Sequence, residues 1–299
     1  MHEPASRPRR VALITGAASG IGAATVRRFL REGWCVALNH VAGQREAAEA
    51  LAAMADVAQG RRAIAIEADV TRDDDCVRLV EATVQALGRL DVLVNAAGIS
   101  KMVPHARLHD VSAEDFQRIY AVNTIGTFQM MRAAAPHLKA AASATRPTSA
   151  ASTASATRAA GAGAGADGEP GARGTVGTSG ASAIVNISSR AALMGSGSSI
   201  PYAASKAAVN ALTMSLARVL APEVRVNAVC PALVEQGFVE RLAPESFAAR
   251  REHQIGVSPL RRIGHPDEVA EAIHWLATGA SMMTGAIVEL DFGMHLNAI

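Results

Sequence analysis

Short apolar runs alternate with amphipathic segments along most of the chain. The apolar runs have the length and composition of buried parallel strands, and they span residues 10–16, 35–39, 62–70, 90–98, 183–189, 224–232 and 286–292. Residues 19–33, between the first two runs, carry Ile21, Val26, Phe29 and Leu30 on one helical face. The same reasoning predicts helices over residues 43–60, 72–88, 112–138, 201–221 and 265–278, with Ser112 as a helix cap.

This alternation predicts an α/β fold with helices on both faces of one sheet. Right-handed crossovers between parallel strands give a doubly wound, mainly parallel, Rossmann-type sheet of about seven strands in a three-layer arrangement. No repeat period and no second block of composition is visible along the sequence. We therefore expect a single domain over residues 1–299.

One stretch departs from this pattern. Residues 141–182 consist almost entirely of Ala, Gly, Ser and Thr, with Val176 as the only larger apolar side chain. Such a segment buries too little surface to offset the entropy of ordering it, so we predict a disordered, low-complexity insertion. It lies between a helix and the following strand, so it enters the sheet at the edge opposite the carboxyl ends where ligands bind.

Composition and charge exclude several classes of partner. The 299 residues are 49% hydrophobic and carry a net charge of +2, and no Lys/Arg cluster is large enough to indicate nucleic acid or an anionic membrane. The isolated Cys35, Cys76 and Cys230 have no CxxC or metal-ligand spacing, so we expect buried thiols in a reducing cytoplasm. The histidines lack ligand spacing as well, and no metal is expected.

The first strand runs through a glycine-rich turn directly into a helix. Residues 7–24 also have the basic, apolar and small-residue order of a secretory signal, but the spacing of Gly16, Gly20 and Gly22 favours a turn. Glycines at these positions let the backbone approach a pyrophosphate, which binds the N–H groups at the helix start. The strand–turn–helix context is the one that a dinucleotide-binding motif requires.

Thr15–Gly22 resemble the TGxxxGIG fingerprint of the classical short-chain dehydrogenase/reductase family, and the chain is similar to its 3-oxoacyl-[acyl-carrier-protein] reductase-like members. Further family motifs follow in order. They are Asp69-Val70, Asn95-Ala96-Ala97-Gly98, Asn123, Ser189, and the Tyr202 and Lys206 of "YAASK". The resemblance places the cofactor against Gly16, Ser19, Gly20, Ile21, Gly22, His40, Asp69, Val70, Asn95, Ala96, Gly98, Tyr202, Lys206, Pro231 and Val234.

Chemistry gives the catalytic candidates their roles. Hydride transfer to a carbonyl carbon needs a proton for the oxygen, and a phenol with a pKa near 10 donates it more readily when a nearby cation lowers that pKa. Tyr202 and Lys206 are four residues apart, so they share one helical face. The resemblance makes Tyr202 the general acid/base, Lys206 its tuning cation, Ser189 the group that orients the carbonyl, and Asn123 the anchor of a relay water. Ser188 competes with Ser189, and the 13-residue spacing to Tyr202 selects Ser189.

Cofactor preference is read at the end of the second strand. A carboxylate there would bond the ribose 2′-hydroxyl of NAD, but the chain has Asn39-His40-Val41. A pocket without a carboxylate does not repel a 2′-phosphate, and His40, Gln44 and Arg45 are candidates to contact it. The sequence therefore favours NADP(H) over NAD(H), although Ser19 stands where many NADP-dependent relatives carry a basic residue.

The resemblance assigns residues 233–259 to a substrate lid, although an amphipathic surface helix would have the same composition. Two departures from the family pattern occur. After the sixth strand the expected Pro-Gly is Pro231-Ala232, and the Thr expected a few residues later is replaced by Gln236 or absent. Near the end of the chain the expected Asp-Gly-Gly is Asp291-Phe292-Gly293. The substrate class implied is a small ketone, a secondary alcohol or an acyl thioester. A sugar or polyol dehydrogenase of the same family is an alternative, and so is a non-catalytic regulator that binds nicotinamide. A homotetramer or homodimer, through the helices around Asn123 and Tyr202, is also implied.

Overall fold

A seven-stranded, all-parallel sheet forms the centre of the protein, as the alternating pattern predicts. The computed structural model describes residues 9–56, 60–145 and 182–297. The strand order is β3-β2-β1-β4-β5-β6-β7, with β1 and β4 adjacent at the point where the winding reverses. The strands are β1 (Val11–Ile14), β2 (Cys35–His40), β3 (Ala63–Glu67), β4 (Val92–Asn95), β5 (Ser182–Ile187), β6 (Val224–Pro231) and β7 (Ile287–Leu290).

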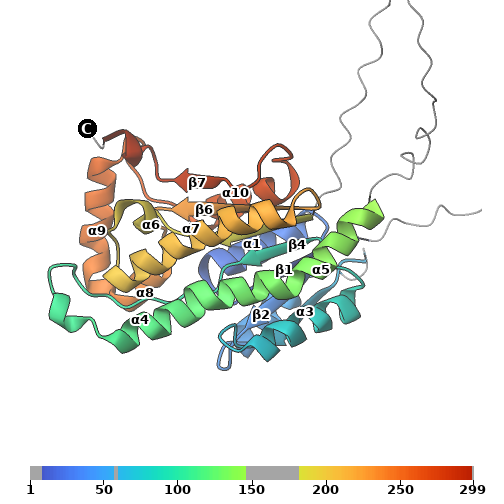
Figure 1. Cartoon of the computed structure of the whole chain (residues 1–299). Coiled ribbons are helices and arrows are strands. Elements are labelled where there is room, and N and C mark those ends of the chain that lie inside the picture. Colours follow the sequence, from blue (N-terminus) through green and yellow to red (C-terminus); the bar gives the residue numbers. More distant parts are fainter. Residues whose placement is uncertain (1–8, 57–59, 146–181, 298–299) are drawn as a thin grey trace, which may run out of the picture.

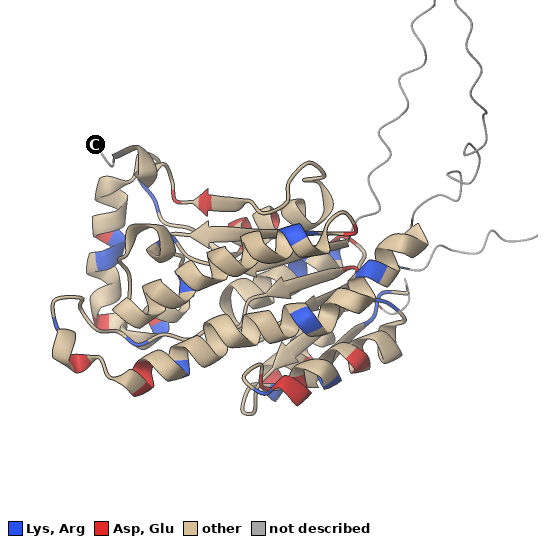
Figure 2. Ribbon diagram, in the orientation of Figure 1, with Lys and Arg blue, Asp and Glu red and all other residues tan. Residues whose placement is uncertain are grey.

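Helices cover both faces of the sheet (Figure 1). They are α1 (Gly20–Arg31), α2 (Arg45–Ala52), α3 (Asp73–Leu87), α4 (Ala113–Tyr120), α5 (Thr127–Thr145), α6 (Ala191–Met194), α7 (Ile200–Leu220), α8 (Phe238–Leu242), α9 (Pro244–Val257) and α10 (Pro266–Thr278). Short 3₁₀ turns occur at Leu108–Asp110 and Met294–Asn297. The Lys, Arg, Asp and Glu residues are spread over these helices and the loops and strands between them (Figure 2).

The core has two layers because successive side chains of a strand point to opposite faces. In β1, Ala12 and Ile14 pack with α1 and α10, whereas Leu13 packs with α3, α5 and α7. Phe29 of α1 is fully buried and packs edge-on against Trp34, with ring centroids 5.1 Å apart. The strands β1, β2, β4, β5 and β6 are thus buried between helices on both sides, which explains their nearly continuous apolar character, whereas the edge strands β3 and β7 are only partly buried.

The long helix predicted over residues 112–138 consists of three parts. It begins at a capping box, in which the Ser112 hydroxyl accepts from the Asp115 N–H and the Asp115 carboxylate accepts from the Ser112 N–H. A π-helical turn, Ala121–Gly126, separates α4 from α5. Such turns are found frequently at functional sites, and this one contains Asn123.

Two predicted boundaries were wrong. The helix predicted over residues 43–60 spans only Arg45–Ala52, where Ala48 and Leu51 are its buried contacts, and Met54 just beyond it is exposed. The insertion was also placed too wide. Ala141 and Ala142 are buried in the last turns of α5, and Ser182 opens β5 with its hydroxyl bonded to Leu138 O at 2.8 Å. The remainder of the predicted insertion, residues 146–181, lies outside the described residues.

The two flanks of that segment lie at the edge of the sheet predicted for them. Thr145 ends α5 and accepts a hydrogen bond from Arg89 at 3.2 Å, next to the start of β4. Ser182 begins β5, and its N–H bonds Glu223 O just before β6. Figure 1 shows these flanks at the opposite end of the molecule from α8 and α9. Directly paired β4 and β5 join the parts of the chain on either side of the segment in one sheet.

Candidate active site

The glycine-rich turn between β1 and α1 has the close backbone contacts that only glycine allows. A Cβ on Gly22 would lie 2.2 Å from Gly16 O, and one on Gly16 would lie 2.7 Å from Ala97 Cα. Gly16 and Gly20 also have positive φ angles, of 58° and 52°. Ser19 caps α1 without a side-chain hydrogen bond to the helix. The Ser19 side chain therefore does not occupy the first N–H groups of α1, which can bind an anion at this end of the helix.

A cavity of about 1200 Å³ opens beside this turn at the carboxyl ends of the strands. It brings together most of the residues proposed from the sequence. These are Gly16, Ser19, Gly20, Ile21, Gly22, Asp69, Val70, Ala96, Gly98, Ser189, Tyr202, Lys206, Pro231 and Val234. Segments more than 200 residues apart in the sequence thus form one wall, as expected at the edge where open α/β sheets bind ligands.

Ser189, Tyr202 and Lys206 meet at this wall. Ser189 follows β5, and its hydroxyl lies within hydrogen-bonding reach of the Tyr202 hydroxyl. Tyr202 and Lys206 occupy successive turns of α7, and Lys206 Nζ lies 5.9 Å from the centre of the Tyr202 ring. The competing Ser188 is 2% exposed, and its hydroxyl donates to Lys206 O at 3.0 Å. The adjacent hydroxyls therefore have different partners, with Ser189 beside Tyr202 and Ser188 bonded to the backbone of α7.

The ionisation of Tyr202 differs from the expectation. Burial raises the pKa of Tyr202 to about 12, and the hydrogen bond from Ser189 only partly opposes this effect. Burial also lowers the pKa of Lys206 to about 8. The predicted lowering of the Tyr202 pKa by Lys206 is therefore wrong for the ligand-free protein, because loss of hydration dominates at both groups. Tyr202 is a neutral phenol at pH 7, which is the form that donates a proton.

Asn123 lies beneath the cavity wall and is fully buried. Its Oδ1 accepts from Ile99 N at 2.8 Å, and its Nδ2 donates to Ile99 O and to Ser205 Oγ, both at 3.0 Å. Both amide N–H donors are therefore used to join the Gly98-Ile99 loop to α7. Lys206 Nζ donates to Ile187 O at 2.8 Å, and a Cβ on Gly98 would come within 3.5 Å of it. The π-turn, the loop after β4 and α7 thus fix one another around Lys206.

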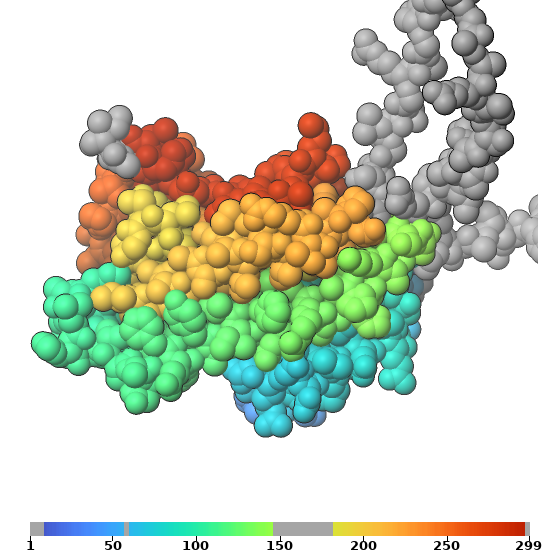
Figure 3. Space-filling view, viewed as in Figure 1, coloured from blue at the N-terminus to red at the C-terminus, as the bar shows by residue number. Residues whose placement is uncertain are grey.

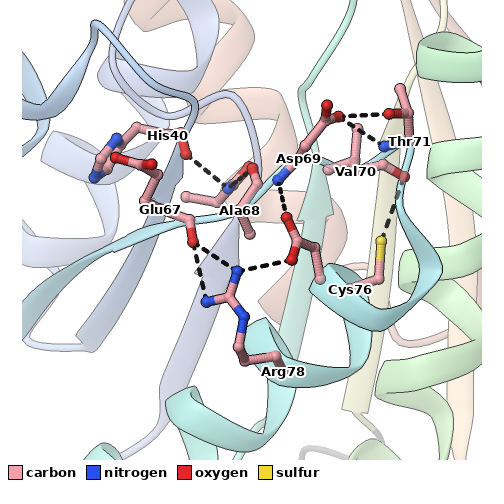
Figure 4. Close-up of polar contacts among 10 residues, drawn as sticks. His40, Glu67, Ala68, Asp69, Val70, Thr71, Cys76 and Arg78 are labelled. Atoms are coloured by element: carbon pink, nitrogen blue, oxygen red, sulfur yellow. Dashed lines mark hydrogen bonds and ion pairs between the residues drawn. The ribbon is translucent and has the colours of Figure 1, made fainter.

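Asp69 and Val70 form another part of the wall, after β3. The Asp69 carboxylate accepts hydrogen bonds from the Thr71 N–H at 2.9 Å and the Thr71 hydroxyl at 2.8 Å, and the Asp69 N–H donates to Asp75 at 2.9 Å (Figure 4). Gln129 of α5 donates to Val70 O at 2.8 Å. These bonds hold the turn formed by Asp69, Val70 and Thr71 in place, and one side of this turn faces the cavity.

Two of the proposed cofactor contacts do not reach the cavity. His40 is 3% exposed, its Nδ1 lies 3.1 Å from Val41 O, and it is absent from the wall, which Asn39, Val41 and Gln44 form instead. His40 is the last residue of β2, and its side chain is buried away from the cavity. Asn95 is also 3% exposed, and it donates to Asn186 Oδ1 at 2.8 Å between β4 and β5. Its polar group joins neighbouring strands and does not line the site.

Other contributors were missed. Thr15 Oγ1 accepts from the N–H groups of Ala96 and Ala97 at 3.0 and 3.1 Å, and Asn39 Oδ1 accepts from Gly16 N at 3.3 Å. Both side chains fix the backbone that the cavity exposes. The sequence did contain a signal for both residues. A polar side chain at the end of an apolar strand is expected to be buried there, and a buried polar group needs a hydrogen-bond partner.

The proposed lid over residues 233–259 is a pair of helices against the cavity. One face of α9 lines it, with residues at helical spacing: Ser246, Ala249, Arg250, His253, Gln254 and Val257. Gln254 Oε1 accepts from Leu233 N at 2.9 Å, which ties α9 to the loop after β6. Phe238 of α8 packs on Tyr202, with ring centroids 5.3 Å apart. Within the described residues, Asp69 supplies the single carboxylate of the wall, against the cations of Arg118, Arg190, Lys206, Arg241 and Arg250.

These features fit a nicotinamide dinucleotide. A Cβ on Gly16 or Gly22 would clash with the backbone of the turn, so these positions need glycine. The first N–H groups of α1 can bind an anion, and the cavity wall has an excess of positive charge. One group with metal-ligand chemistry lies elsewhere: ligand atoms of Glu289, Asp291 and His295 are within 4.8 Å of one another. The Asp291 carboxylate there already accepts from Gly293 N and His295 N.

Comparison with known proteins now gives the family. Residues 10–163 match the model of the short chain dehydrogenase family, and residues 172–295 match that of the enoyl-(acyl carrier protein) reductase family. The chain belongs to the short-chain dehydrogenase/reductase family. It is therefore an oxidoreductase that acts on CH–OH groups with NAD(P). The Rossmann-type fold and the relation to 3-oxoacyl-[acyl-carrier-protein] reductases are confirmed by the same comparisons.

Several relatives span nearly the whole chain. A protein of Streptomyces violaceoruber named as a granaticin polyketide synthase ketoacyl reductase is 36% identical over 96% of this chain and 96% of its own length. Cis-4-hydroxycyclohexanecarboxylate dehydrogenase of Sinomonas cyclohexanicum is 34% identical, with 95% and 96% covered. Among solved structures, the 3-ketoacyl-(acyl-carrier-protein) reductase of Brucella melitensis in complex with NADH has a TM-score of 0.74 and 30% identity, covering 95% of this chain and 98% of that one.

No helix among the described residues is both long enough and apolar enough to cross a membrane.

Proposed function

We propose that this chain interconverts a ketone, or a 3-oxoacyl group, and a secondary alcohol, with Tyr202 as the general acid/base. The observation that carries this proposal is the meeting of Ser189, Tyr202 and Lys206 on one wall of the cavity that the glycine turn opens. A regulator that only binds nicotinamide would need no proton donor at this place. The named activities of the ketoacyl reductase relatives support the same reaction class.

In this proposal Tyr202 and Ser189 act on the substrate oxygen, and Lys206 acts on Tyr202. A nicotinamide held against the cavity wall by the glycine turn would supply the hydride in one direction and accept it in the other. Tyr202 donates its hydroxyl proton to the carbonyl oxygen during reduction, and Ser189 hydrogen-bonds the same oxygen while negative charge develops there. Lys206 lies on the same face of α7 as Tyr202, where its positive charge stabilises the phenolate once the proton has left. Asn123 positions the loop beside Lys206.

The same proposal favours NADP(H) as the cofactor. Where β2 ends, the cavity wall is formed by Asn39, Val41 and Gln44, and none of these three residues carries a negative charge. The end of β2 therefore offers no group that repels a 2′-phosphate. Arg45, at the start of α2, is the nearest basic residue in the sequence and is paired with Glu67 at 3.3 Å.

We further propose one catalytic domain, with residues 233–259 as its lid, that assembles as a homotetramer or homodimer in the cytoplasm. The α4, α5 and α7 helices present a continuous surface in Figure 3. Several apolar side chains on or beside these helices are exposed, among them Phe116, Ile125, Met214 and Val219. Three buried free thiols are compatible with a reducing compartment.

The experiment is a panel of ketones and secondary alcohols, each assayed with NADPH/NADP⁺ and NADH/NAD⁺ by the absorbance of the reduced nicotinamide. Tyr202→Phe is the decisive variant, and Tyr120→Phe is its matched control because Tyr120 is the other tyrosine of the chain and lies outside the cavity wall. We expect Tyr202→Phe to lower kcat about 10²–10⁴-fold while cofactor still binds. A kcat of Tyr202→Phe that stays within about ten-fold of the wild type would overturn the proposal.

A further inference from the structure

The first turn of the lid lies directly over the glycine-rich turn. A Cβ built on Gly20 would be 3.5 Å from Gln236 O and 3.9 Å from Nη1 of Arg241. The same Nη1 donates to Gln236 O at 2.9 Å, and the Gln236 N–H donates to Glu240 Oε2 at 2.6 Å. Residues 236–241 are thus folded back on themselves, with the Arg241 guanidinium above the start of α1.

Arg241 has capacity for a further partner. No ion pair joins it to a carboxylate within the described part of the chain, and its hydrogen bond to Gln236 O uses one of the five guanidinium N–H donors. It is exposed and lines the cavity. Other lid arginines differ in this respect: Arg251 pairs with Glu235 at 3.9 Å and does not line the cavity.

Gly20 begins α1, and the first N–H groups of this helix would bind the pyrophosphate of a dinucleotide. A guanidinium on the opposite side of that anion matches the planar, bidentate geometry that phosphate oxygens prefer. We propose that Arg241 binds the cofactor pyrophosphate from the lid side, so that the phosphates join α8 to α1. The inference rests on the proposed nicotinamide-dependent function and adds a residue to it.

This role also accounts for a departure noted in the sequence. Gln236, near which the family resemblance leads us to expect a Thr, has a positive φ of 52° and lies outside the cavity wall. Its carbonyl, rather than its side chain, is what contacts the site, because it holds Arg241 Nη1. In this proposal Arg241 of α8, five residues later, makes the contact that the Gln236 side chain does not make.

The test is equilibrium binding, measured by fluorescence or calorimetry without turnover. Arg241→Gln is compared with the wild type and with Arg251→Gln, which removes the same charge from the outer side of the lid. We expect Arg241→Gln to raise the Kd of NADPH and of NADH by the same factor, about ten-fold, which corresponds to about 1.4 kcal/mol. Arg251→Gln should leave both Kd values within two-fold, and Arg241→Lys should recover part of the loss. A thermal melt of each ligand-free variant verifies the fold.

The two cofactors separate the outcomes. A loss confined to NADPH would place Arg241 at the 2′-phosphate and overturn the proposal. Equal affinities of the wild type and Arg241→Gln for both cofactors would overturn it too, while leaving the proposed function intact. A wild-type protein that binds neither cofactor would instead overturn the proposed function. A wild-type Kd that rises more steeply with salt than that of Arg241→Gln is the further result that supports the phosphate contact.

Discussion

The Phe238 ring, at the start of α8, packs on the Tyr202 ring of α7 with centroids 5.3 Å apart. Phe238 is half-buried and joins a small apolar cluster with Ala191, Tyr202 and Ala203. This contact makes the lid part of the environment of the proposed acid/base, because it removes water from one side of the phenol. Burial of Tyr202 as a whole is the main cause of its raised pKa, about 12, and Phe238 covers one side of the ring.

Removing the Phe238 ring should therefore lower the Tyr202 pKa. In Phe238→Ala we expect the pKa to fall from about 12 toward its ordinary value near 10, because water reaches the phenolate. The chain has two tyrosines, so a spectrophotometric titration of tyrosinate in a Tyr120→Phe background reports Tyr202 alone. Phe247→Ala, in the same lid but outside the cavity wall, is the control. Identical titration curves for Phe238→Ala and its parent would contradict this account.

The adjacent serines after β5 should separate catalysis from stability. Ser189→Ala removes a hydrogen-bond donor beside Tyr202, so we expect kcat to fall about 10²-fold with little change in stability. Ser188→Ala removes a buried bond to Lys206 O and should lower the free energy of unfolding by about 1 kcal/mol while kcat changes by less than about three-fold. Steady-state rates and urea unfolding of both variants check the pair. Reversed effects would mean that the two hydroxyls have been assigned wrongly.

Lys206 should give unfolding a particular pH dependence. Burial lowers its pKa to about 8 in the folded protein, against 10.5 for an unperturbed lysine. Between these two values the unfolded chain binds more protons than the folded one, so this group makes stability rise as pH increases from about 8 to about 10.5. In Lys206→Met that contribution should vanish, so the difference in unfolding free energy between wild type and variant shifts in favour of the wild type across this window. A difference that is flat with pH would contradict the lowered pKa.

Cofactor preference should follow Val41 rather than His40. Val41 lines the cavity, so Val41→Asp places a carboxylate there and should lower kcat/KM for NADPH at least about ten-fold relative to NADH through like-charge repulsion. His40→Gln should leave the ratio of the two cofactors within about two-fold, since His40 is buried outside the wall. A ratio that changes with His40 and not with Val41 would restore the interpretation made from the sequence.

Some of the site residues could be predicted from the sequence, whereas His40 and Asn95 could not. The positions of Gly16, Tyr202 and Lys206 follow from local rules, because a positive φ at a strand–turn–helix junction and a four-residue helical spacing are set by neighbouring residues. His40 and Asn95 depend instead on which way a strand side chain points at the end of the strand, and on a partner in the next strand. Long apolar runs that are buried on both faces do not encode that direction.

The pKa shifts of Tyr202 and Lys206 could not be predicted from the sequence for a related reason. The four-residue spacing predicts that Lys206 lies near Tyr202, and the structure confirms it. The sign of the effect on each pKa depends on how much water the fold removes, which in turn depends on Phe238 in the lid and on the contacts of Lys206 with Ile187 and Gly98. These contacts join segments that are far apart in the chain, so no local pattern contains them.

The segment between α5 and β5 offers the last prediction. Its flanks, Thr145 and Ser182, lie at the sheet edge opposite the cavity, where Arg89 and Glu223 hold them. Replacing residues 146–181 with a short Gly/Ser linker should therefore leave KM and kcat within about two-fold, because closure of a shorter loop changes the free energy of folding only slightly. Steady-state kinetics, a thermal melt and the oligomeric mass of the shortened protein check this. Loss of hydride transfer in a shortened protein that still folds and keeps its oligomeric mass would show that the segment acts at the site.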